Sequence, residues 1–214
     1  MNNKLYNFGK YSGFLVLILI CAMAAFGQGS QHEPQQDITT QKVDEEKGLE
    51  FYNKALDCAK SDLDCQIENY NKSIQFNPNY KSAFYNRGNV YDSQNKQDLA
   101  IADYNRAIEL DPRYVNAYIN RGIAYGKKGK LDEAIDNFTK AIELDDKMPE
   151  AYHNRGYAYQ LKGDHQRAIK DFTKAIALSP DYPKPYYGRA KSYLAIGENE
   201  KARADMERYK ELTK

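Results

Sequence analysis

Two adjacent stretches of sequence decide the fold: VNAYINRGIAYGKKGKLDEAIDNFTKAIELDDKM at residues 115–148 and PEAYHNRGYAYQLKGDHQRAIKDFTKAIALSPDY at residues 149–182. Each is 34 residues long, and the two align without a gap. A period of about 20–50 residues is typical of a solenoid, in which each unit packs on its neighbours. The same columns continue on both sides, as in Tyr91, Tyr125, Tyr159 and Tyr193 and in Ala100, Ala134, Ala168 and Ala202.

Each unit contains two segments whose apolar and small residues recur at helical steps of three and four. Tyr118, Gly122 and Tyr125 share one face of the first segment, and Ala134 and Phe138 share one face of the second. A glycine between the halves suits the end of a helix, where left-handed geometry is common. The sequence therefore predicts helical hairpins, with first helices at Lys81–Gln94, Val115–Lys128, Pro149–Lys162 and Pro183–Ile196 and second helices such as Leu131–Leu144.

These columns resemble the tetratricopeptide repeat, whose pattern is W-x2-L-G-x2-Y, then A-x3-F, then P. In the unit 81–114 the pattern is carried by Phe84, Arg87, Gly88, Tyr91, Ala100, Tyr104 and Pro112. The resemblance is strong over 81–214 and confined to the second half of 47–80. It implies an all-α, right-handed α-solenoid of stacked hairpins: a degenerate repeat at 47–80, then repeats at 81–114, 115–148, 149–182 and 183–214.

The resemblance also implies a concave groove, lined by the first helices, that takes an extended peptide or a partner helix. Asn86, Asn120 and Asn154 recur two residues before each repeat glycine, and their amides could pair with successive backbone groups of such a peptide. The alternative is that these amides satisfy local polar groups. The groove residues implied are Tyr85, Asn86, Asn89, Asn120, Ile123, Lys127, His153, Asn154, Tyr157, Tyr187 and Lys191.

A column of arginines replaces the usual leucine of the repeat. Buried arginine stems with paired heads are one interpretation, because aspartates recur on the second helices; a cationic strip for acidic peptides is the other. The family's clamps for acidic chaperone tails need Lys and Arg in groove positions that here hold residues such as Tyr85 and Asn120, so that clamp is not expected. The arginines are Arg87, Arg121, Arg155 and Arg189, and the aspartates are Asp103, Asp171 and Asp205, with Asn137 interrupting the series.

The first 27 residues have a different character. Lys4 and Lys10 precede an apolar run at 14–26, which is short for a membrane span of about 20 residues. A basic start, a short apolar stretch and small residues near its end predict a signal peptide at 1–27, with a retained signal anchor as the alternative. Residues 28–46 are polar and Gln-rich, which predicts a flexible tether because they cannot bury enough apolar surface to offset their ordering entropy.

Removal of the signal peptide would leave two cysteines, Cys58 and Cys65, in a protein bound for an oxidising compartment. They flank the sequence AKSDLD, which is expected to form the turn between two helices. The pair is therefore a candidate disulfide that fastens a hairpin. The alternative is two small buried thiols within a helix pair.

Composition and motifs argue against several classes of function. The formal net charge is +1, without the basic excess of a nucleic-acid binder. His32, His153 and His165 lie far apart in sequence, and no second His or Cys stands at metal-ligand spacing. No phosphate loop or nucleophile motif occurs. We therefore expect no enzyme activity, no catalytic residue, no metal and no cofactor.

These observations predict an exported scaffold or adaptor that mediates protein–protein interaction, in the periplasm or outside the cell, most simply of a bacterium. Its partner would be another protein or an extended peptide, bound in the concave groove. Contact with a membrane is expected only through an uncleaved signal peptide. The alternative is a structural module of the cell envelope that assembles with copies of itself.

Overall fold

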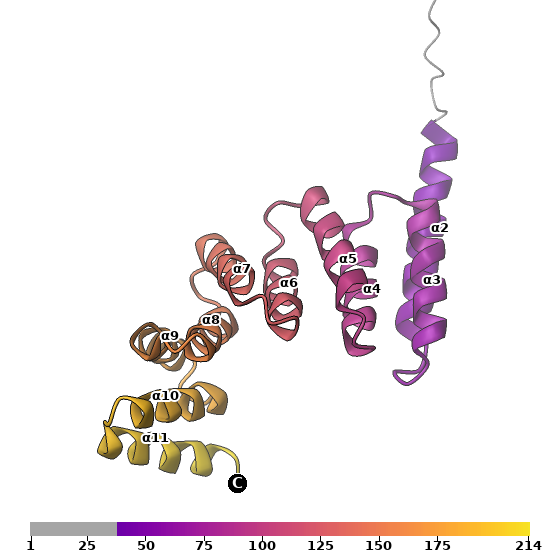
Figure 1. The fold of residues 1–214 in the computed structure, drawn as a ribbon. Coiled ribbons are helices and arrows are strands. Elements are labelled where there is room, and N and C mark those ends of the chain that lie inside the picture. The colour runs from indigo at the N-terminus through magenta and orange to yellow at the C-terminus, as the bar shows by residue number, and fades with distance from the viewer. Residues whose placement is uncertain (1–37) are drawn as a thin grey trace, which may run out of the picture. The chain divides into compact units, whose positions relative to one another are not determined.

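The computed structural model describes residues 38–214, so the predicted signal peptide lies outside the described residues. The compact unit Lys42–Lys214 holds the hairpins and is considered by itself. Ten α-helices and no strand occur in the described part of the chain, which confirms the all-α solenoid of helical hairpins (Figure 1). They are α2 (Ile38–Asp57), α3 (Leu63–Phe76), α4 (Lys81–Ser93), α5 (Gln97–Leu110), α6 (Val115–Lys127), α7 (Leu131–Leu144), α8 (Pro149–Leu161), α9 (His165–Leu178), α10 (Pro183–Ala195) and α11 (Asn199–Leu212).

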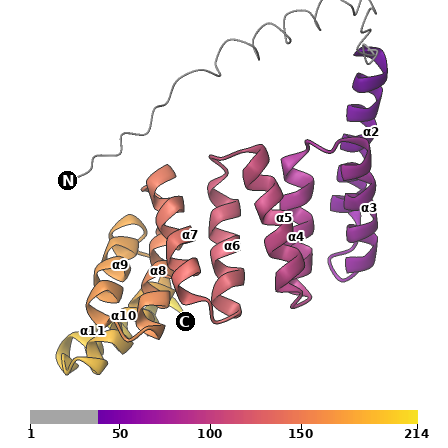
Figure 2. The same ribbon diagram turned by 45° about the horizontal axis from the view of Figure 1, so that its top comes forward.

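The helices pair as hairpins in chain order, and each hairpin packs on the next (Figure 2). From α4 onward each hairpin closes through a three-residue turn, as at 94–96. One residue of each turn has a positive φ, and three of these four residues are glycines, which adopt left-handed geometry without steric cost. They are Asn95 (φ 58°), Gly129 (φ 74°), Gly163 (φ 80°) and Gly197 (φ 83°).

Small residues allow the two helices of a hairpin to approach closely. A Cβ atom added at Gly122 would lie 2.7 Å from the ring of Phe138, and one added at Gly88 would lie 2.8 Å from the ring of Tyr104. Ala134 is fully buried where α6 and α7 meet. A larger side chain at Gly88 or Gly122 would force the helices of its hairpin apart, so the recurring Gly column is a requirement of packing.

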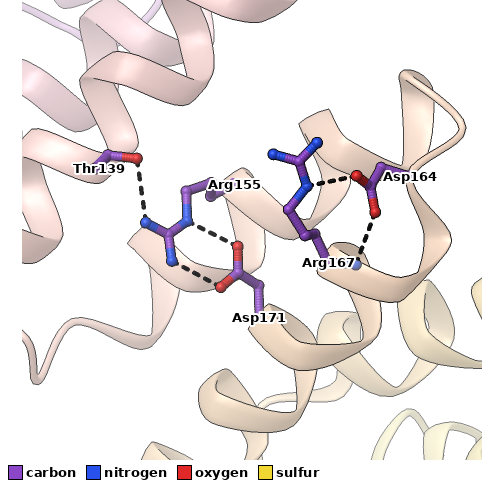
Figure 3. A network of polar contacts seen from close by, with 5 residues as sticks. All are labelled: Thr139, Arg155, Asp164, Arg167 and Asp171. Atoms are coloured by element: carbon purple, nitrogen blue, oxygen red, sulfur yellow. Dashed lines mark hydrogen bonds and ion pairs between the residues drawn. The ribbon is translucent and has the colours of Figure 1, made fainter.

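The arginine column ties each hairpin to the one before it. Arg155 donates from Nε and Nη2 to the two carboxylate oxygens of Asp171, both at 2.8 Å, and from Nη1 to Thr139 Oγ1 of the preceding hairpin (Figure 3). Such bidentate, charge-assisted bonds are among the stronger ones in proteins. The paired-head interpretation therefore holds for three of the four arginines, through the pairs Arg87–Asp103, Arg155–Asp171 and Arg189–Asp205.

The first hairpin departs from the others in its turn. Five residues, 58–62, separate α2 from α3, compared with three between α4 and α5. Two extra residues shift α2 relative to the repeat frame, which explains why the first half of 47–80 matches the pattern poorly. The structure joins Cys58 and Cys65 by a disulfide, with their Cα atoms 6.0 Å apart, and this bond closes the longer turn.

The prediction of a flexible tether through residue 46 is wrong for residues 38–46, because α2 begins at Ile38. The later part of α2 is anchored on α3: Ser73 Oγ donates to the Gly48 carbonyl at 2.7 Å, and Ala55 is buried. Adding residues to an existing helix costs far less than nucleating one. Residues 38–47 contain no Gly or Pro to stop this extension.

Candidate peptide-binding groove

The first helices α4, α6, α8 and α10 carry all the predicted groove residues. Each of these helices contacts the next one of the set directly, from α4 to α6, α6 to α8 and α8 to α10. Residues at the same position of successive repeats therefore form rows that run along the groove.

A pocket of about 370 Å³ opens between α6 and α8, with α7 behind it. Its floor consists of buried residues that include Phe138 and Ala134, and its rim carries Tyr157 and Leu161, which are 50% and 53% exposed. An apolar hollow with an exposed apolar rim is typical of a site that buries a ligand side chain. The lining residues are Gly122, Ile123, Gly126, Lys127, Leu131, Ala134, Phe138, Asn154, Tyr157, Ala158 and Leu161.

Gly126 creates this hollow. A Cβ atom added there would meet nothing closer than the Cβ of Ala134, at 4.0 Å. The residues one repeat before and after it, Asp92 and Gln160, carry side chains that could occupy the equivalent space. The missing side chain at this position of the repeat therefore enlarges the open volume between α6 and α8.

The equivalent space between α4 and α6 is polar. Asp92 on α4 accepts a hydrogen bond from Lys127 Nζ on α6 at 2.6 Å, so these two charges neutralise each other. The pocket there measures about 250 Å³ and is lined by Asn89, Asp92, Tyr104, Asn120 and Ile123.

The equivalent space between α8 and α10 is bridged by Gln160. Its Nε2 donates to the Gly188 carbonyl at 2.8 Å and to Ser192 Oγ at 2.7 Å. Both acceptors lie on α10, so this side chain links the last two first helices. The same position of three successive repeats thus holds an ion pair at Asp92, an open space at Gly126 and a hydrogen-bonded bridge at Gln160.

The asparagine row does not form three equivalent rungs. Asn86 Nδ2 donates to Tyr52 Oη at 2.8 Å, and Asn120 Nδ2 donates to Tyr85 Oη at 3.0 Å. The helix before Asn154 offers Ile119 where Tyr85 stands one repeat earlier, so it has no hydroxyl to accept a bond. Asn86 and Asn120 satisfy local polar groups, as the alternative interpretation proposed, while Asn154 lines the apolar pocket.

His153 is a packing residue rather than an open groove contact. Its ring lies 5.7 Å from that of Phe172 and 5.4 Å from that of Tyr182. Burial, followed by the nearby charge of Lys184, lowers the pKa of His153 to about 4. At neutral pH the imidazole is therefore uncharged and belongs to the aromatic stack.

The C-terminal end of the groove is basic and aromatic. Lys191 Nζ lies 5.5 Å from the ring of Tyr187, and that ring contacts Tyr209 at 5.2 Å. Lys184 and Lys191 are exposed, and no carboxylate of the described residues lies within ion-pair distance of either. These lysines face solvent without an ion pair to any of the described residues.

Sequence reasoning missed Gly126 and Leu161 as groove residues. Gly126 has no side chain that would mark it as a contact, but its column, Asp92, Gly126, Gln160 and Leu194, changes its chemistry at every step. Such variation on the groove face of an otherwise regular repeat was the available signal.

Within residues 38–214 no cluster of three or more His, Cys, Asp and Glu side chains is arranged to hold a metal ion. None of the helices described there combines the length and apolar composition needed to cross a bilayer. Nothing in this part of the chain points to an enzymatic activity.

Stacked hairpins whose first helices line successive pockets define a helical repeat protein of the kind that binds polypeptides. Three models of one family match the sequence: TPR repeat at 88–129 and 127–163, and two models of the tetratricopeptide repeat at 149–182 and 69–102. The chain is a tetratricopeptide repeat protein. No curated protein matches it.

Solved structures support the fold. A crystal structure of MamA is 26% identical over 72% of this chain and 90% of its own, with a TM-score of 0.67. YrrB, described as a tetratricopeptide repeat protein with an unusual peptide-binding site, is 21% identical over 82% of this chain and 92% of its own, with a TM-score of 0.64. The first repeat domain of Spaghetti (RPAP3), bound to the HSP90 peptide SRMEEVD, is 27% identical over 54% and 92%, with a TM-score of 0.53.

Proposed function

We propose that the protein is an exported scaffold that binds an extended segment of a partner protein in the groove of α4, α6, α8 and α10. The apolar pocket between α6 and α8 carries this proposal, because it can bury an apolar side chain of a ligand. Two similar structures, YrrB and Spaghetti, are described in terms of peptide binding.

Export is proposed from residues 1–27, whose basic start and short apolar run are typical of a signal peptide. The Cys58–Cys65 disulfide agrees with an oxidising compartment. Mass spectrometry of the protein from a cell-envelope fraction tests this part, with Gln28 expected as the new N-terminus. An intact N-terminus on a soluble cytoplasmic protein would contradict it.

Filling the pocket tests peptide binding. The full chain is used to select binders from a library of random peptides displayed on phage, and their affinity is measured by fluorescence anisotropy. Gly126→Leu is expected to abolish binding of the selected peptides. Stability should not fall, because Leu is a better helix former than Gly and the added Cβ has room.

Ala102→Leu is the matched control, since it adds the same side chain on the exposed face of α5, outside the groove. It should leave the affinity of the selected peptides unchanged. Peptides that bind wild type and Gly126→Leu equally well would show that the pocket is not their site.

A self-assembling module receives less support from the structure. Stacking of copies through the last hairpin would use the outer face of α11, which carries exposed charges that favour contact with water. These include Glu200, Lys201, Arg203, Glu207 and Lys210. Size-exclusion chromatography with light scattering at two concentrations separates the two functions, and a monomer at both is expected.

A further inference from the structure

The apolar and charged side chains of the groove are unevenly distributed between its two ends. Between α4 and α6 the pocket is polar and its one carboxylate, Asp92, is already paired with Lys127. On α8 and α10 four large apolar side chains are about half exposed: Tyr157 (50%), Leu161 (53%), Tyr187 (43%) and Leu194 (54%). The apolar part of a ligand therefore fits the C-terminal end of the groove.

The same end carries the free positive charge. Helix α10 contains no Asp or Glu. Its Arg189 is paired with Asp205, which leaves Lys184 and Lys191 exposed with no carboxylate of the described residues within ion-pair distance. Glu150 on α8 is the one exposed acid on this stretch of first helices, so lysines outnumber acids there.

The spacing between the pocket and the lysines follows from the repeat. Tyr157 on the pocket rim and Lys191 stand at the same position of consecutive repeats. Packed helices lie about 8–10 Å apart, and an extended chain rises about 3.3 Å per residue. One step along the groove therefore corresponds to about three residues of an extended ligand.

We propose that the groove selects an acidic peptide segment: a large apolar side chain fills the hollow at Gly126, and an Asp or Glu about three residues away pairs with Lys191 and Lys184. This proposal rests on the proposed function and adds the chemistry of the ligand. A basic segment is disfavoured because the only carboxylate that lines the pocket between α4 and α6, Asp92, is already paired, and because α10 carries exposed lysines and no acid.

Parallel selections test the proposal, with the full chain and the random peptide library on phage. Wild type is expected to enrich a large apolar residue together with Asp or Glu about three positions away. The double variant Lys184→Met/Lys191→Met, which keeps most of the stem length, should retain the apolar enrichment and lose the acidic one. Lys170→Met, an exposed lysine on α9, is the matched control and should behave as wild type.

Selected peptides are then compared with versions in which the acid is replaced by its amide. Wild type should lose roughly threefold to tenfold in affinity, the range of one or two exposed ion pairs, and the double lysine variant should lose nothing. Acidic enrichment that survives in the double variant, or wild-type peptides without acidic enrichment, would overturn the proposal while peptide binding stands. Binders that ignore Gly126→Leu would instead overturn the proposed function.

Discussion

The hairpins α6–α7 and α8–α9 share the same framework but differ on both sides of their first helix. On the groove side, Gly126 leaves a hollow where Gln160 forms a bridge to α10. On the opposite side, Arg121 meets Asn137 where Arg155 meets Asp171. The hairpin that contributes most of the pocket is therefore also the one with the weaker polar framework.

The electrostatics of the two arginines differ accordingly. Arg155 forms a bidentate pair, and its hydrogen bonds to Asp171 raise the pKa of the guanidinium. Arg121 donates to two neutral amides, Asn137 and Asn105, at 2.7 Å each, and burial lowers its pKa. A buried cation without a carboxylate partner carries a desolvation cost that the neighbouring hairpins offset.

The largest effect on stability is expected when the carboxylate opposite Arg155 is replaced by an amide, as in the hairpin α6–α7. Asp171→Asn removes the charge opposite Arg155, and breaking such a buried pair costs roughly 2–4 kcal/mol of unfolding free energy. Urea unfolding of the full chain measures it. Asp136→Asn, exposed on α7, is the control and should stay within about 0.5 kcal/mol of wild type. Equal midpoints for both variants would contradict this role of the pair.

A second experiment compares the room available to a larger side chain at the same repeat position of α7 and α9. Ala134 and Ala168 are both fully buried, but only Ala134 lines the hollow. Ala168→Leu is expected to cost about 1–3 kcal/mol through overpacking. Ala134→Leu should cost clearly less, because its side chain can extend into the open volume, and it should weaken binding of the selected peptides.

Thermal unfolding of both leucine variants provides the readout. Ala134 and Ala168 belong to the same repeating column of small residues, and that column alone would predict equal overpacking at both positions. Equal losses at the two positions would support that simpler expectation and would show that the hollow cannot accommodate a side chain from its floor.

This contrast explains how much of the molecule could be predicted from its sequence. The hairpins could, because each depends on local columns such as Gly122 and Phe138: the predicted helix Leu131–Leu144 coincides with α7, and Val115–Lys128 exceeds α6 by one residue. In the first hairpin the turn between Cys58 and Cys65 could be predicted, but the register of α2 could not, because this turn holds two extra residues.

The groove was predicted as a surface but not in its detail. Which amides are free depends on hydroxyl groups supplied by a neighbouring helix, as Tyr85 supplies to Asn120 but Ile119 cannot supply to Asn154. The hollow depends on the absence of a side chain at Gly126. Both properties arise between repeats, where a pattern read within one repeat gives little information.

His153 stands where the preceding repeat has Ile119, which does not titrate. His153 is therefore expected to make the stability of the protein depend on pH. Because burial lowers the folded-state pKa of His153 from 6.5 to about 4, the unfolded chain binds a proton more readily between these values. The contribution of His153 to stability is therefore fully present above pH 6.5 and is lost as the pH falls towards 4. From pH 7 to pH 5 the loss is on the order of 2 kcal/mol.

His153→Gln tests this by urea unfolding at both pH values. The variant should lose less stability than wild type over the same interval, because glutamine does not titrate. An identical pH dependence in both proteins would show that other groups titrate in this range and that His153 does not cause the loss of stability in acid.

The smallest effect is expected from restoring the missing carboxylate in α6–α7. Asn137→Asp places a charge opposite Arg121, whose burial is already established in the wild type, so the new pair offsets an existing cost. A gain of about 1 kcal/mol is expected at neutral pH. It should disappear in acid as the new carboxylate becomes protonated.

Asn53→Asp, exposed on α2, is the control, and it should change stability by less than about 0.5 kcal/mol. Because Asn137 lies on the side of the hairpin away from the hollow, peptide affinity should stay at the wild-type value. A gain in stability accompanied by a loss of affinity would instead show that the weaker framework of α6–α7 is itself a requirement of binding.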